Sequence, residues 1–157
     1  MKTRELYNII DAFCPKTLSC SWDNDGIMVS PSLDAEVKRV LLSLDATYEA
    51  VSYAADYGYD TLITHHPMLF RGAKSVNETT LSGRRIIRAL SSGVTVMSFH
   101  TRLDACEGGV NDELMNRLGF TPTGAFGDEE SPTLARIADI PPMTARELAC
   151  LVRDKLG

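Results

Sequence analysis

The sequence has few features of a membrane-bound or secreted protein. No apolar run is long enough to cross a membrane, and residues 1–13 mix charges into an amphipathic pattern unlike a secretory signal. The four cysteines form no Cys-x-x-Cys pair and no zinc-knuckle spacing, so reduced thiols are the simplest interpretation. We therefore expect a soluble protein located in the cytoplasm, with no membrane partner.

The sequence also has fewer basic residues than acidic residues. The chain carries 16 Lys and Arg residues against 21 Asp and Glu residues, a formal net charge of -5. Because polyanions repel an acidic chain, we expect neither nucleic acid nor an anionic membrane surface as a general partner. Nucleotide-binding fingerprints are missing too, since the sequence has no Walker A loop and no Gly-x-Gly-x-x-Gly motif.

What the sequence does contain is an alternation of helix and strand patterns within 157 residues, enough for one compact domain. Apolar residues at helical spacing predict a first helix over residues 3–13, which Pro15 ends. Short apolar runs predict strands at 40–44, 60–64 and 94–99, with helical patterns between them and a further short helix at 110–118. This order predicts an α/β fold whose core is a parallel sheet built from consecutive β-α-β units.

Two local signals refine this prediction. The run at 40–44 has the continuous apolar character of a buried parallel strand. The helix that follows it can be capped by Asp45 or Thr47, and Gly58 is placed to end it.

The last thirty residues have a different pattern. Residues 134–140 alternate like a half-buried strand, and Thr144 with Glu147 forms a capping box for a final helix. We divide the chain into an α/β unit at 1–126 and a strand-helix pair at 127–157. The second part has the pattern expected for the start of a second α/β unit, although a packed terminal helix explains it as well.

The residues best suited to bind a metal lie where two predicted strands end. His65 and His66 follow the second strand, His100 follows the third, and Asp104 comes four residues later. Ligands of open α/β sheets bind outside the carboxyl ends of the strands. Neighbouring side chains of a strand point to opposite faces, so both histidines serve one site only if the backbone leaves the strand, which Pro67 favours. Imidazoles and a carboxylate are ligands for zinc, iron, manganese or cobalt, so we expect a metal site.

Less specific interpretations stand beside this one. A histidine at a strand end is commonly a hydrogen-bonded loop residue, but all three histidines of the chain lie at this edge. His100 either ligates the metal or orients Asp104 and a bound water. Cys106 has the position to add a thiolate, although a small buried thiol fits it better.

Two loops carry weaker signals. Gly108 and Gly109 precede a predicted helix, where backbone N–H groups can bind phosphate, but a tight entry turn explains them equally well. Around Trp22, the Asn-Asp-Gly sequence favours a structural turn. The alternative is that Asp23 or Asn24 reaches toward the metal edge.

The stretches "SWDNDGIMV", "LITHHPMLF" and "HTRLDACEGGVND", in this order, resemble the NIF-three-like family of dinuclear-metal proteins. Some members of that family carry the label GTP cyclohydrolase 1 type 2. The resemblance implies a toroidal homohexamer with two divalent metal ions per subunit facing an inner cavity. It also implies that His65, His66 and Asp104 are metal ligands, with Asp104 bridging the two ions.

The sequence departs from the family pattern at two places. Arg102 stands where the family usually has Asn, which adds a cation suited to a phosphate-bearing ligand together with Gly108 and Gly109. A second α/β unit and a final His and Glu, which complete the family's metal set, are not present in these residues. Two four-coordinate ions need about eight donor positions, so we expect the natural chain to be longer.

The resemblance implies a metal-dependent hydrolase acting on a nucleotide or another phosphate-bearing small molecule. In such a site two cations activate a water molecule near neutral pH and polarise the bond under attack. The alternative is a non-catalytic metal-binding ring that acts through protein partners. No residue pattern identifies a catalytic side chain beyond the ligands.

Overall fold

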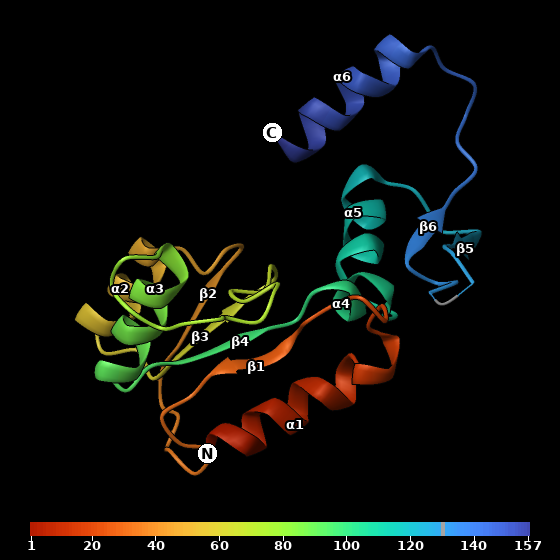
Figure 1. The fold of residues 1–157 in the computed structure, drawn as a ribbon. Helices are drawn as coiled ribbons and strands as arrows, with labels where there is room; N and C mark the ends of the chain where they lie inside the picture. The colour runs from red at the N-terminus through yellow and green to blue at the C-terminus, as the bar shows by residue number, and fades with distance from the viewer. Residues whose placement is uncertain (130) are drawn as a thin grey trace.

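The computed structural model describes residues 1–129 and 131–157, and it has the α/β fold that the sequence predicts (Figure 1). The helices are α1 (Thr3–Phe13), α2 (Tyr48–Asp56), α3 (Leu81–Ser91), α4 (Thr101–Ala105), α5 (Val110–Leu118) and α6 (Ala145–Leu156), with a 3₁₀ turn, η1, at Lys16–Leu18. The strands are β1 (Gly26–Val29), β2 (Val40–Ser43), β3 (Thr61–Thr64), β4 (Thr95–Ser98), β5 (Gly124–Phe126) and β6 (Ala135–Ile137).

A four-stranded sheet of order β1-β4-β3-β2 forms the centre of the fold. Strands β2, β3 and β4 are parallel, as the β-α-β pattern predicts. Strand β1 was not predicted, and it pairs with β4 in the antiparallel direction. It begins at the glycine of an Asn-Asp-Gly sequence that indicated a turn, so the three apolar residues that follow did not stand out.

Helices cover both faces of this sheet, and α1 lies on the face opposite α2 and α3 (Figure 1). Side chains alternate between the two faces, as the pleat of a strand requires. Leu62 and Val96 pack with α2 and α3, whereas Ile63 and Met97 pack toward α1. Both faces of β4 are therefore buried, which accounts for its continuous apolar sequence.

Strand β2 corrects the prediction of a buried strand at 40–44. It lies at the edge of the sheet, and 74% of the surface of Leu42 is exposed. Leu44, just beyond the strand, is also exposed. An apolar run does not distinguish a strand with two neighbours from a strand with one, because the position in the sheet is set by the topology.

The helix signals in the sequence were accurate. Thr47, not Asp45, caps α2, because its side chain accepts a hydrogen bond from the backbone N–H of Ala50 (3.1 Å). Helix α2 is followed by Gly58, which adopts a positive φ of 70°, a conformation that favours glycine. Helix α5 has the bounds that the sequence predicts.

The C-terminal residues form a small antiparallel hairpin, β5-β6, followed by α6. The division proposed after residue 126 falls between the two paired strands of this hairpin. Arg136 of β6 joins the hairpin to α5, since its Nε donates to Asp112 Oδ1 (2.5 Å) and its Nη2 donates to the carbonyl oxygens of Ala105 and Cys106. Among the described residues, no helix has the length and apolar character needed to span a membrane.

Candidate metal centre

The carboxyl ends of β3 and β4 are aligned in a way that brings the three histidines together. Thr64 and Ser98 are register partners, and their hydroxyl oxygens lie 2.9 Å apart. The backbone N–H of Phe99 then donates to the carbonyl oxygen of Thr64 (2.9 Å), so His65 and His100 leave adjacent strands at the same level.

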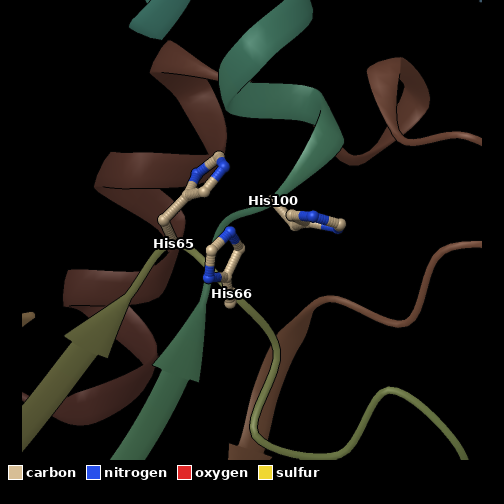
Figure 2. Close-up of side chains that lie close together, drawn as sticks. All are labelled: His65, His66 and His100. Carbon is tan, nitrogen blue, oxygen red and sulfur yellow. The ribbon is translucent and has the colours of Figure 1, made fainter. Parts of the chain in front are cut away.

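The backbone leaves the strand at the histidine pair, as the sequence predicts. The N–H of His66 donates to the carbonyl oxygen of Leu44, beyond β2, and the hydroxyl of Thr64 donates to the carbonyl oxygen of His66 (2.8 Å). This turn allows neighbouring histidines to face one site instead of opposite faces of the sheet. Figure 2 shows the imidazoles of His65, His66 and His100 gathered beyond the two strand ends.

The three imidazoles lie at distances suited to a metal ion. One ring nitrogen from each of His65, His66 and His100 lies within 4.8 Å of the others. The ring centroids are 5.0 to 5.8 Å apart. Since ligands around one ion lie about 2 Å from it, separations of this size need little adjustment to share a cation.

Two of the histidines are oriented by carboxylates. The Nδ1 atom of His66 lies 2.8 Å from Asp45 Oδ1, and that of His100 lies 3.0 Å from Asp23 Oδ1. Each contact occupies one ring nitrogen and leaves Nε2 for another partner. Metal-binding histidines characteristically make such a contact, because the carboxylate selects the tautomer and holds the ring.

Asp23 is a firmly held member of this arrangement. Its side chain is buried, and it accepts hydrogen bonds from the backbone N–H (3.1 Å) and the hydroxyl (2.5 Å) of Thr101. Burial alone would raise the pKa of Asp23, but the hydrogen bonds from Thr101 and His100 outweigh it and lower that pKa. Asp23 is therefore an anion beside His100.

His65 and Asp104 form a second partly buried pair in the centre. His65 Nε2 lies 3.6 Å from Asp104 Oδ1, slightly beyond hydrogen-bonding distance. Burial lowers the pKa of His65 and raises that of Asp104, so the site disfavours an isolated charge on either group. Among the described residues, the buried Nδ1 of His65 has no hydrogen-bonding partner. A partly buried imidazole whose Nε2 faces a carboxylate without a close hydrogen bond fits a divalent cation.

The structure therefore places His65, His66, His100 and Asp104 at one edge of the sheet, as the sequence predicts. The tight cluster within 4.8 Å consists of the three imidazoles, and His100 is a full member of it. Asp104 lies beside His65, on the first turn of α4.

Arg102 does not have the role expected from the sequence. Its side chain is fully buried on the α1 side of the centre, where Nε donates to Asp25 Oδ2 (3.0 Å) and Nη1 to Asp11 Oδ1 (2.6 Å). Its guanidinium carbon lies 4.5 Å from the centroid of the Phe99 ring. In this arrangement the guanidinium is paired with two carboxylates and shielded from solvent, so it offers no contact to a phosphate.

The glycine pair is also used by the fold itself. The N–H of Gly108 donates to Asp112 Oδ2 (2.7 Å), and the N–H of Gly109 donates to the carbonyl oxygen of Cys106 (3.1 Å). Gly108 has a positive φ of 72°, and a Cβ on Gly109 would lie 2.0 Å from the carbonyl oxygen of Leu103. These constraints account for both glycines as an entry turn to α5, and they offer no free N–H to a phosphate.

Cys106 is a structural thiol. It is buried, and its Sγ lies 3.6 Å from the carbonyl oxygen of Leu103. Burial raises the pKa of the thiol, so the thiolate form required of a ligand is disfavoured. The buried-thiol interpretation of the sequence is the one that the structure supports.

Asp45 was missed as part of the site. The sequence suggested it only as a helix cap, whereas it holds His66 from beyond the end of β2. Its position at the end of the first predicted strand was a usable signal, because neighbouring parallel strands end at the same edge. Asp23 was considered at the sequence level but given less weight than a structural turn.

Comparison with known proteins places this geometry in a family. A sequence model described as Duf34/NIF3 (NGG1p interacting factor 3) matches residues 1–157. The chain belongs to the Duf34/NIF3 family. This agrees with the resemblance carried by the three sequence stretches.

Curated relatives of this family member are longer than the chain. A protein of Clostridium perfringens is 34% identical over 163 residues, which cover 100% of the chain and 61% of the relative. A protein of Clostridium acetobutylicum is 32% identical, with 98% of the chain and 59% of the relative covered. Both are named GTP cyclohydrolase 1 type 2 homolog. The chain thus spans about three fifths of the length of these relatives.

Solved structures share the fold. The Bacillus cereus protein related to NIF3 is 29% identical, with a TM-score of 0.75 over 81% of the chain and 35% of that protein. Reduced HcgD from Methanocaldococcus jannaschii is 31% identical, with a TM-score of 0.75 over 82% of the chain and 51% of that protein. The protein ybgI matches 99% of the chain and 61% of its own length with a TM-score of 0.84, and its 23% identity supports the fold alone.

Proposed function

We propose that this Duf34/NIF3 member binds divalent metal ions through His65, His66, His100 and Asp104 and uses them in hydrolysis. The observation that carries the proposal is the paired orientation of two imidazoles: Asp45 holds His66 and Asp23 holds His100, each through Nδ1. Holding a ring in this way preserves a free nitrogen at the shared space, which a structural histidine does not require.

The proposed centre would hold two ions, as the family resemblance implies, and Asp104 would be a ligand placed to serve both. Three imidazoles and one carboxylate are too few for two four-coordinate ions. Water molecules and donors outside residues 1–157 would complete the coordination, in keeping with the greater length of the relatives. Zinc, iron, manganese and cobalt all suit this donor set.

The proposed reaction is hydrolysis of a nucleotide, in line with the name that the relatives carry. When bound, a divalent cation supplies Lewis acidity that lowers the pKa of a water molecule and polarises the bond under attack. The chain's own residues contribute orientation: Asp23 and Asp45 fix the imidazoles, and His65 and Asp104 are partly buried, which limits their contact with bulk water. The raised pKa of Asp104 and the lowered pKa of His65 follow from that burial.

Metal binding is the first property to measure. Protein stripped with a chelator would be titrated with Co²⁺ and followed by its visible absorption. We expect His66→Ala and His100→Ala to weaken binding most, and Asp45→Asn and Asp23→Asn to weaken it by roughly 10- to 100-fold. Asp154→Asn, an exposed carboxylate on α6, is the matched control and leaves the affinity unchanged. Equal Co²⁺ affinity in all variants would contradict the proposal.

Measuring hydrolysis distinguishes an enzyme from a non-catalytic metal-binding ring. GTP and simple phosphoesters would be offered to the metal-loaded protein, and hydrolysis should disappear with chelator and with Asp104→Ala. Tight metal binding without turnover across a broad panel would instead favour a non-catalytic metal-binding ring that acts through protein partners.

Assembly is a separate part of the proposal. The resemblance implies a homohexamer, and the exposed Leu42 and Leu44 at the sheet edge are apolar surface that an assembly would cover. Light scattering of the purified protein would test it, and a monomer at all concentrations would remove this element of the proposal.

A further inference from the structure

Two large aromatic side chains stand beside the histidines without being buried. Trp22 and Phe70 meet edge to face, with ring centroids 6.1 Å apart and an interplanar angle of 60°. Both also contact the ring of His100, at centroid distances of 6.3 and 6.4 Å. Yet 55% of Trp22 and 48% of Phe70 remain exposed.

The loop that carries Trp22 is held in place on both sides of this residue. The backbone N–H of Cys20 donates to Thr101 Oγ1 (3.0 Å), and that of Asp23 donates to the carbonyl oxygen of Cys20 (3.0 Å). The carboxylate of Asp23 in turn contacts His100 and Thr101. Trp22 is thus an exposed ring on a fixed support.

The loop that carries Phe70 is tied to the same support. The side-chain amide of Asn24 donates a hydrogen bond to the carbonyl oxygen of Leu69. This bond joins the segment before β1 to the segment after β3, which are 45 residues apart in the sequence. It sets the two aromatic rings side by side next to the metal centre.

The polar groups near the two aromatic rings indicate which kind of ligand can bind there. An apolar protein partner would be met by a broad apolar surface, but here both rings contact the imidazole of His100, whose Nδ1 is held by the carboxylate of Asp23. A ligand that fits has a flat apolar part and a polar part that reaches the histidines. Planar heteroaromatic rings stack on exposed tryptophan and phenylalanine, whatever their exact hydrogen-bonding pattern.

We propose that Trp22 and Phe70 form an aromatic subsite that binds the base of a nucleoside-type ligand while its reacting part reaches His65, His66 and His100. This inference rests on the proposed hydrolytic function and deepens it by assigning the residues that hold the base of the substrate. Neither Arg102 nor the entry turn at Gly108 and Gly109 is free to bind a phosphate, so base stacking supplies a substantial part of the affinity.

The chain offers a direct probe, since Trp22 is its single tryptophan. Zn²⁺-loaded protein would be titrated with guanosine 5′-monophosphate while the tryptophan fluorescence is followed, with free N-acetyltryptophanamide as the control for light absorption by the base. We expect saturable quenching by the nucleotide and none by ribose 5-phosphate at the same concentrations. Quenching by neither compound, or equally by both, would overturn the subsite.

Two substitutions test the stacking itself. Trp22→Leu and Phe70→Leu keep apolar bulk but remove the aromatic face, and calorimetry should show guanosine 5′-monophosphate binding weakened roughly tenfold in each. Tyr57→Leu, an exposed aromatic residue at the C-terminal cap of α2, is the matched control and changes nothing. Nucleotide affinity equal to that of the original protein in both site variants would overturn the proposal.

Measuring Zn²⁺ affinity in the same variants distinguishes a failure of the aromatic subsite from a failure of the proposed function. Zn²⁺ affinity should stay within about twofold in Trp22→Leu and Phe70→Leu, because neither residue offers a ligand atom. If Zn²⁺ binds tightly while the leucine variants bind nucleotide normally, the subsite is wrong and the metal centre stands. If the original protein fails to bind Zn²⁺, the proposed function itself fails.

Discussion

The region around the sheet and the region after it contain similar local helix and strand signals but differ in how many side chains they bury. Residues 3–118 place apolar side chains on both faces of the sheet, and Leu62, Val96, Met97 and Phe99 are fully buried. In the part after residue 118 that the structure describes, Ser131 is the one buried residue. Both regions have well-formed helices, so a sequence can specify a helix without burying that helix in a core.

Helix α6 shows this separation most clearly. Its capping box is complete, with the N–H of Thr144 donating to Glu147 Oε2 (2.7 Å) and the N–H of Glu147 donating to Thr144 Oγ1 (3.2 Å). The cap of α3, Thr80, makes the same type of contact with the N–H of Gly83 (3.0 Å). Helix α3, however, also buries Ile86 and Ala89 against the sheet. Most of a helix's stability in a protein comes from such burial.

The largest effect is expected from Arg102→Met. Removing the guanidinium leaves Asp11 without its ion pair and leaves the buried carboxylate of Asp25 with the half-exposed Lys16 as its remaining cation. The loss should lower the free energy of unfolding by about 3–5 kcal/mol. Arg153→Met, whose partner Asp154 is exposed on α6, should cost below about 1 kcal/mol. Urea unfolding followed by circular dichroism measures both. Similar losses would mean that the buried network does not distinguish the two regions.

A core substitution sharpens the comparison without involving charge. Leu62→Ala removes a fully buried side chain from β3 and should lower the free energy of unfolding by about 2–5 kcal/mol. The matched change Leu148→Ala on α6 removes a half-buried side chain and should cost below about 1 kcal/mol. Urea midpoints at constant m-value give the comparison, and a larger loss at Leu148 would reverse it.

Arg136 joins the two regions, so Arg136→Met should loosen the hairpin by about 1–3 kcal/mol while the sheet stays folded. Amide hydrogen exchange should speed up in residues 124–137 and not in β3 or β4. Faster exchange throughout the sheet would show that the hairpin supports the core.

Acid should act on the same contact. The hydrogen bond from Arg136 holds the pKa of Asp112 below its ordinary value of 3.8. A lowered folded-state pKa means that the contribution of Asp112 is complete above pH 3.8 and is lost as the pH falls through the folded-state value. Asp112→Asn should remove this pH dependence from the exchange of the hairpin, and a dependence that survives the substitution would assign it to another group.

The smallest effect is expected at the helix caps. Thr144→Ala should cost α6 about 1 kcal/mol and speed up exchange in its first turn, while the midpoint of global unfolding stays unchanged. Thr80→Ala should cost α3 a similar amount but lower the global midpoint, because α3 is packed into the core. Equal effects on the midpoint would mean that α6 belongs to the same cooperative unit.

Much of the fold was predictable because its signals are local. The bounds of α1 and α5 and the parallel order of β2, β3 and β4 follow from spacing and short apolar runs. The signals that failed are those that depend on distant neighbours. Strand β1 pairs antiparallel with β4 across about 70 residues, and the apolar run of β2 lies at an exposed edge.

The sequence by itself determined most of the helices and the three parallel strands, and it placed three histidines at strand ends, since caps and periodicity act over a few residues. Only the tertiary structure decided their partners. Asp45 meets His66 across 21 positions and Asp23 meets His100 across 77. Arg102 was drawn into the interior by Asp25, also 77 positions away. Such pairings depend on which strand ends the fold brings together, and no local pattern encodes that.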